Sequence, residues 1–179
     1  MRRRDVCLWC ITLLIAASAA LRAADDILRI VPIVSKDNVV VSFDGTEAYT
    51  PDVRAAIASG LKTTFTYEIE LRTVVPTWID RTIATSIVSV SDQYDNLTRR
   101  HTLERRIDGR VEQALVTEDE AVVKDWLTSF SRLPLVMTSK LDQTRDYYVR
   151  IHARVRPRGT SLLGWSNGIS GQAKFTFVP

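Results

Sequence analysis

The chain has 179 residues, of which 24 are Lys or Arg and 21 are Asp or Glu. The only cysteines in the sequence are Cys7 and Cys10. The rest of the chain therefore cannot contain a disulfide framework, a cysteine metal site or a cysteine nucleophile. The length is that of one ordinary domain, which is large enough to be stable without a metal or a disulfide.

An export signal is predicted for residues 1–24. Three arginines at positions 2–4 precede an apolar run over residues 6–20, and small residues follow up to Ala24. This order is typical of a secretory leader, and the run is shorter than the roughly 20 apolar residues of a membrane-spanning helix. We expect cleavage near Ala24 or at Ala20, with an uncleaved anchor as the alternative. The leader holds four of the basic residues and one acidic residue, so residues 25–179 have 20 of each and no net charge.

Two strands and a helix are predicted at the start of the exported part. Residues 27–34 and 38–43 are rich in Ile and Val, which indicates strands. Thr50 and Pro51 indicate the start of a helix, with Thr50 as its N-cap. Gly60 is placed to end that helix.

A run of four strands is predicted next. Residues 64–75 alternate apolar and polar side chains, which indicates a strand with one buried and one solvated face. Turn signals at Asp95-Asn96 and Asp108-Gly109 separate the later strands. The four strands cover residues 64–75, 81–90, 97–107 and 110–116. Their short connections predict an antiparallel meander.

The last part of the chain is predicted to contain a helix and two strands. Residues 117–120 (Thr-Glu-Asp-Glu) have the pattern of a helix capping box, and Pro134 follows that helix. Residues 146–156 form a strand with Tyr147 and Val149 inward and Tyr148 and Arg150 outward. A turn-rich stretch over residues 157–171 leads to a final strand over residues 173–178.

The predicted order is therefore β-β-α-β-β-β-β-α-β-β, in a single β-rich domain over residues 25–179. Amphipathic strands with only two helices favour an α+β fold. We expect a curved antiparallel sheet or open barrel of about eight strands, with the helices on one face or end. A two-sheet β-sandwich is the alternative.

Several segments carry a family resemblance: Phe43-Asp44-Gly45 to Leu71 ("FDGTEAYTPDVRAAIASGLKTTFTYEIEL"), Trp78 to Arg81, the Tyr94-Asp95 pair, and "LDQTRDYYVRIHARV" at residues 141–155. Together they resemble the bacterial exported proteins grouped as domain of unknown function 4390, over nearly all of the exported part. The resemblance implies a Gram-negative source and a periplasmic or envelope location. It implies no activity, cofactor or catalytic residue. Members are often encoded beside a sensor histidine kinase of the nitrogen-regulation type, which points to envelope sensing.

A basic face is the strongest candidate for function. Arg150, Arg154 and Arg156 share one face of the strand over residues 146–156, and Arg99 and Arg105 lie on the strand after the Asp95-Asn96 turn. If these strands approach each other, their guanidinium groups form an anion-binding face that grips phosphate or carboxylate groups. The alternative is an ordinary charged surface, in which acidic residues such as Glu68 and Glu70 pair with arginines across strands.

The sequence contains no coherent catalytic arrangement, so we do not expect an enzyme, a metal site or a cofactor. His101 and His152 are isolated on strands among arginines, and we expect both to be exposed. Residues 164–168 match G-x-S-x-G, but a strand rather than a helix follows and no acid or histidine lies downstream, which indicates a loop.

The sequence leaves two candidate functions. The first is a non-enzymatic envelope module that binds a protein partner or supports sensing, through the arginine face or through the loop that contains Trp165. The second is a periplasmic carrier or receptor for an anionic amphiphile, with an apolar cavity opening beside Arg150 or Arg154. A filled core favours the first. We expect no nucleic-acid partner and no transmembrane segment after the leader.

Overall fold

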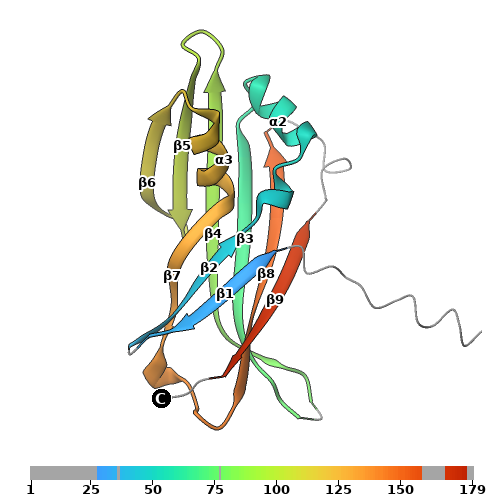
Figure 1. Cartoon of the computed structure of the whole chain (residues 1–179), viewed down its shortest axis with the longest axis vertical. Helices are drawn as coiled ribbons and strands as arrows, with labels where there is room; N and C mark the ends of the chain where they lie inside the picture. The colour runs from blue at the N-terminus through green and yellow to red at the C-terminus, as the bar shows by residue number, and fades with distance from the viewer. Residues whose placement is uncertain (1–27, 36, 77, 159–167, 177–179) are drawn as a thin grey trace, which may run out of the picture.

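A computed structural model describes residues 28–35, 37–76, 78–158 and 168–176. In this part of the chain, two antiparallel sheets and two α-helices form the fold (Figure 1). The predicted β-rich α+β class is confirmed. The sheets have three and six strands and do not close into a barrel.

The chain begins with β1 (Arg29–Val34), β2 (Asn38–Asp44), the 3-10 helix η1 (Thr46–Ala48) and α2 (Pro51–Ala58). The predicted start of α2 is confirmed, because the Thr50 hydroxyl oxygen accepts a 3.3 Å hydrogen bond from the backbone N–H of Val53. Gly60, two residues after the last helical turn, has a φ of +83°. That left-handed conformation suits glycine and ends the helix as predicted.

The six-stranded sheet has the order β6-β5-β4-β3-β8-β9. Its strands are β3 (Thr63–Thr73), β4 (Arg81–Asp95), β5 (Arg100–Ile107), β6 (Arg110–Thr117), β8 (Asp146–Pro157) and β9 (Ile169–Thr176). The predicted meander is β3 to β6, and β8 pairs with the other side of β3. β4 extends to Asp95, five residues beyond its predicted end, so that the chain turns at the Asp95-Asn96 signal.

The six-stranded sheet has an apolar inner face and a polar outer face. Along β3, buried and half-buried residues alternate strictly, and Phe65, Tyr67 and Ile69 are fully buried. Their cross-strand partners on β8 include Ala153 and Ile151, which are also buried. The inner face packs against the three-stranded sheet, and the outer face is turned to solvent.

The three-stranded sheet has the order β1-β2-β7, and it corrects one prediction. β7 (Ser129–Met137) pairs with β2 along its whole length, although Pro134 was expected only to follow a helix. Pro134 is accommodated because β7 is an edge strand, where a missing N–H breaks no ladder on the outer side. The described residues therefore form nine strands rather than about eight.

Helix α3 (Glu120–Thr128) starts two residues later than the predicted capping box requires. Its N-cap is Asp119, whose carboxylate accepts a 2.8 Å hydrogen bond from the N–H of Ala121. Thr117 ends β6 instead, and its hydroxyl oxygen accepts from the N–H of Asp119. The box pattern was misleading because pairing with β5 keeps Thr117 extended. The short 3-10 helix η2 (Thr138–Lys140) follows β7.

Aromatic rings fill the space between the two layers. Phe43 of β2 stacks on Phe130 of β7 with ring centroids 4.6 Å apart, and Tyr67 of β3 lies within 5.1 Å of both. At the other margin, β1 lies against β9 (Figure 1). There a Cβ atom on Gly171 would approach the Cβ of Leu28 to 2.9 Å, so only glycine permits this contact.

Candidate anion-binding site

Hydroxyl side chains form the floor of a candidate site on the outer face. Thr64 of β3 stands opposite Ser91 of β4, and Thr66 stands opposite Ser89. These short polar residues alternate with the buried residues Val88 and Val90 along β4, so the strand period places them outside. Because these side chains are short, they form a shallow polar surface at the middle of the sheet.

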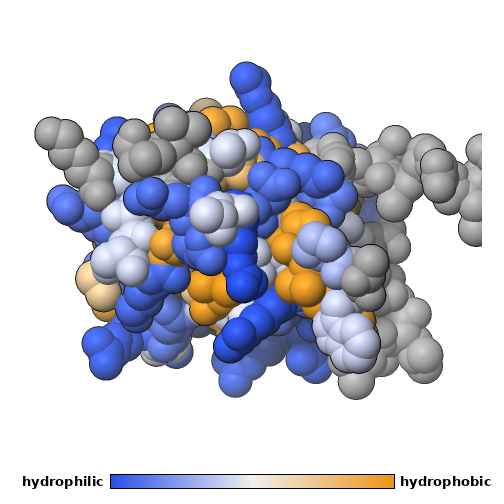
Figure 2. Space-filling model, turned by 90° about the horizontal axis from the view of Figure 1, so that it is seen from below, coloured by the Kyte–Doolittle hydropathy of each residue, from blue (hydrophilic) through white to orange (hydrophobic). Residues whose placement is uncertain are grey.

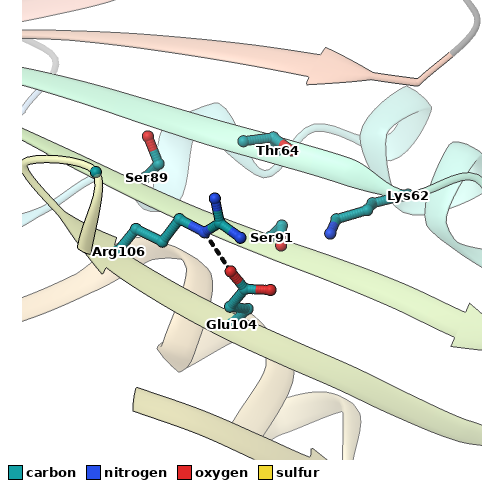
Figure 3. A pocket seen from close by; sticks show the side chains of 7 residues that line it. Lys62, Thr64, Ser89, Ser91, Glu104 and Arg106 are labelled. Atoms are coloured by element: carbon teal, nitrogen blue, oxygen red, sulfur yellow. Dashed lines mark hydrogen bonds and ion pairs between the residues drawn. The ribbon is translucent and has the colours of Figure 1, made fainter. Parts of the chain in front are cut away.

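Thr64, Ser89 and Ser91 of this floor line a groove of about 350 Å³ (Figure 3). Its lining residues are Lys62, Thr64, Ser89, Ser91, Glu104, Arg106 and Gly109. Lys62 extends toward Ser91 from the start of β3, and the guanidinium of Arg106 extends over the floor from the opposite side, on β5 (Figure 3). Glu104 forms an ion pair with Arg106 at this wall. The groove therefore joins two cations, three hydroxyl groups and one carboxylate.

Two of the predicted anion-binding residues border the same floor on β8. Arg154 is the cross-strand partner of Thr66, and Arg156 is the partner of Thr64. Both side chains are exposed, and neither forms an ion pair within the described residues. Arg158 follows at the end of β8, where its N–H donates to the carbonyl of Lys62 at 2.8 Å.

Arg150 lies on the outer face but is already paired. Its Nη2 and Nε atoms donate to one carboxylate oxygen of Glu70, at 2.6 and 3.0 Å. Glu70 also lies 3.8 Å from the guanidinium of Arg72. The expectation that Glu70 pairs with an arginine across strands is confirmed, and Arg150 is neutralised by that pair.

The structure separates the other predicted arginines from this surface. Arg99 occupies the turn between β4 and β5 with a φ of +58°. Arg105 points to the inner face, opposite to Arg154 and Arg156, because it pairs with the buried Val90. β5 and β8 are also separated by β3 and β4. The expected single cluster of Arg99, Arg105, Arg150, Arg154 and Arg156 is therefore wrong in geometry.

Arg105 packs against aromatic side chains on the inner face of the sheet. Its guanidinium lies over the rings of Trp126 and Phe130, at 4.5 and 4.8 Å from their centroids, and donates at 3.0 Å to the backbone carbonyl of Trp126. Burial lowers the pKa of this guanidinium. Leu103 and Ile107 occupy the same strand period, so the alternation in the sequence contained the signal that Arg105 faces inward.

His101 is buried rather than exposed, which corrects a further prediction. Its Nδ1 atom lies 2.8 Å from a carboxylate oxygen of Asp92, and Asp92 has no exposed surface. Burial raises the pKa of Asp92, against the opposing effect of the His101 hydrogen bond. The ring of Tyr94 covers His101 with centroids 4.5 Å apart. The pair lies on the inner face and does not contribute to the outer groove.

His152 stands on the outer face, half-buried, and its cross-strand partner is Glu68. Neither residue lines the groove described above. Among the described residues, no group of three or more His, Cys, Asp or Glu side chains is arranged to hold a metal ion. Nor does any helix there have the length and apolar character needed to cross a membrane.

A second exposed feature was not predicted from the sequence. Trp78 and Ile79, in the connection between β3 and β4, are 80% and 78% exposed. This connection lies at the lower end of the molecule (Figure 1), where apolar residues form small patches among hydrophilic ones (Figure 2). The predicted interaction residue Trp165 and residues 164–167 of the G-x-S-x-G segment lie outside the described residues.

Comparison with known proteins assigns a family. Searches of the curated proteins and of the solved structures give no match. A protein-family model described as "Domain of unknown function (DUF4390)" matches residues 26–160, which is most of the chain and includes every strand up to β8. The resemblance seen in the sequence is thereby confirmed, and the chain belongs to the DUF4390 family.

Proposed function

We propose that this protein is a non-enzymatic module of the cell envelope that docks an acidic protein partner through the arginines at the end of β8. One observation carries the proposal: Arg154, Arg156 and Arg158 are all exposed, and none forms an ion pair within the described residues. Arginine is enriched at the energetic centres of protein interfaces, because its planar fork matches carboxylate groups.

The location is part of the same proposal. The predicted leader over residues 1–24 sends the protein out of the cytoplasm, and the family resemblance implies the periplasm or envelope of a Gram-negative bacterium. A module without a disulfide does not depend on whether its compartment is oxidising or reducing.

The aromatic packing between the two sheets favours docking over transport of an amphiphile. A carrier needs an apolar cavity for the ligand tail. Here the space between the layers holds the packed rings of Phe43, Tyr67 and Phe130. We therefore propose the docking function alone.

Photo-crosslinking in the native envelope tests the proposal. A photoreactive amino acid at Thr66, next to Arg154, should give a discrete crosslinked product with one envelope protein. The double reversal Arg154→Glu/Arg156→Glu should abolish that product, because it replaces two cations by two anions on the docking surface. Arg81→Glu/Arg110→Glu changes the net charge equally at distant strand ends and should leave the product intact. A product that survives the first reversal would refute the proposal.

A further inference from the structure

We infer that the groove between Lys62 and Arg106 is a binding site for a phosphate group. This site adds a small-ligand function beside the docking surface, and it stands independently of the protein partner proposed above. Its lining residues lie on or beside β3, β4 and β5, and the docking arginines on β8 border the same hydroxyl floor without lining the groove.

The first argument is the number of unused donors. The hydroxyl groups of Thr64, Ser89 and Ser91 make no side-chain hydrogen bond within the described part of the chain, and all three line the groove. Lys62 likewise forms no ion pair there. Ser91 is buried, and Thr64 and Ser89 are half-buried. Such hydroxyl groups usually find partners in folded proteins, so three free hydroxyl groups beside an ammonium indicate a site that a ligand completes.

The second argument is the set of directions from which the donor groups reach the groove. The hydroxyl groups lie on the floor, where they are available to donate, and Lys62 reaches in from one end and Arg106 from the opposite side (Figure 3). Donors that converge from three directions match a tetrahedral oxyanion with several acceptor oxygens. A planar carboxylate offers two oxygens, and a single guanidinium fork satisfies both. The arrangement therefore favours phosphate over carboxylate.

The size of the groove agrees with a small phosphorylated compound. Its volume of about 350 Å³ lies at the lower end of the roughly 300–1,000 Å³ typical of small-molecule sites. It has room for a phosphate group with a short attached moiety. The shared chemistry is a phosphate ester, whether in a soluble compound or in the headgroup of a lipid.

Glu104 limits the affinity of this site. Its carboxylate pairs with Arg106 at the wall of the groove, and both side chains are partly exposed. A bound phosphate must compete with Glu104 for the guanidinium and is repelled by its charge. Removing the Glu104 charge should therefore strengthen phosphate binding, whereas removing the Lys62 charge should weaken it.

Titration of the isotope-labelled exported domain with inorganic phosphate, followed by amide chemical shifts at constant ionic strength, tests the inference. We expect saturable shifts at Thr64, Ser89 and Ser91, and no saturable shifts with acetate. Lys62→Met should raise the dissociation constant about tenfold, as expected for loss of a charge-assisted hydrogen bond. Glu104→Gln should lower it about threefold, within the range of an exposed ion pair.

Two variants with equal charge changes serve as controls. Lys174→Met removes an exposed lysine from β9, and Glu112→Gln removes an exposed carboxylate from β6. Neither residue lines the groove, and both variants should bind phosphate as the unmodified protein does. Ser89→Ala provides a further variant that leaves the charge and the fold unchanged and should weaken binding severalfold.

Two probes then distinguish a soluble phosphate ester from a lipid headgroup as the source of the phosphate. Glycerol 1-phosphate represents soluble esters, and vesicles of phosphatidylcholine with or without phosphatidic acid represent the membrane. Binding to either probe that depends on Lys62 supports the site and identifies its source. Absence of saturation with all phosphate probes, or equal affinity of Lys62→Met and Lys174→Met, would overturn the inference. Neither result would affect the crosslinking test of the docking arginines.

Discussion

The phenol of Tyr67 donates a 2.9 Å hydrogen bond to the backbone carbonyl of Leu127. Tyr67 lies at the centre of the six-stranded sheet, and Leu127 lies in the last turn of α3, where carbonyl groups lack helical partners. This buried bond joins the sheet to the helix across 60 residues of sequence. Burial also raises the pKa of the Tyr67 phenol well above its usual value of 10.

Replacing Tyr67 by Phe should lower the free energy of unfolding by about 1–2 kcal/mol at pH 7, because the buried Leu127 carbonyl loses its donor. Denaturant unfolding of both proteins measures this difference. The raised pKa adds a pH dependence. The folded state retains the phenolic proton above pH 10, so the unmodified protein should lose stability as the pH rises beyond that value, and Tyr67→Phe should lose less. Parallel curves for the two proteins above pH 10 would contradict this account.

A methyl group at position 45 should be poorly tolerated. A Cβ atom on Gly45 would lie 3.0 Å from both Cε1 and the hydroxyl oxygen of Tyr67. Gly45→Ala should therefore destabilise the protein by about 1–3 kcal/mol, as overpacking of a core does. Calorimetric melting measures the loss. In the double variant Gly45→Ala/Tyr67→Phe, the loss should be less than the sum of the two single effects, because the substitutions act on one contact.

The buried Asp92–His101 pair should make stability depend on pH. Burial raises the pKa of Asp92, so the folded state holds its proton more tightly than the unfolded state. Asp92 therefore contributes stability that is fully present below its usual pKa and is lost as the pH rises through the raised value. Asp92→Asn removes this loss. The stability of Asp92→Asn relative to the unmodified protein should increase from pH 4 upward, measured by urea unfolding at successive pH values. A difference that stays constant with pH would rule out this titration.

Arg105 and Arg154 should respond differently to the same substitution. Arg105→Lys loses the planar contact with Trp126 and Phe130, and should cost about 1–2 kcal/mol. Arg154→Lys changes an exposed side chain with no ion pair in the described residues and should stay within about 0.5 kcal/mol. Thermal unfolding of both variants makes the comparison. Equal losses would show that Arg105 is not the structural arginine described above.

The local pattern of the sequence determined much of the fold. The alternation of Phe65, Tyr67 and Ile69 with polar residues identified both the strand and its buried face, because side chains of a strand point alternately to opposite sides. The cap at Thr50 was equally readable, since a hydroxyl before proline suits a helix start. The same alternation, applied to Leu103 and Ile107, would also have placed Arg105 inside.

Beyond the meander from β3 to β6, only the tertiary structure decided which strands became neighbours. β7 was not predicted because it contains Pro134. This proline is tolerated because the strand has an unpaired edge. The groove required the order β5-β4-β3, which brings Lys62 and Arg106 to the same hydroxyl floor although they are distant in sequence. The burial of Asp92 with His101 depended on the register between β4 and β5. A strand's own sequence states which face is apolar, but the energy of packing the whole core selects its partners, and the partners determine the site.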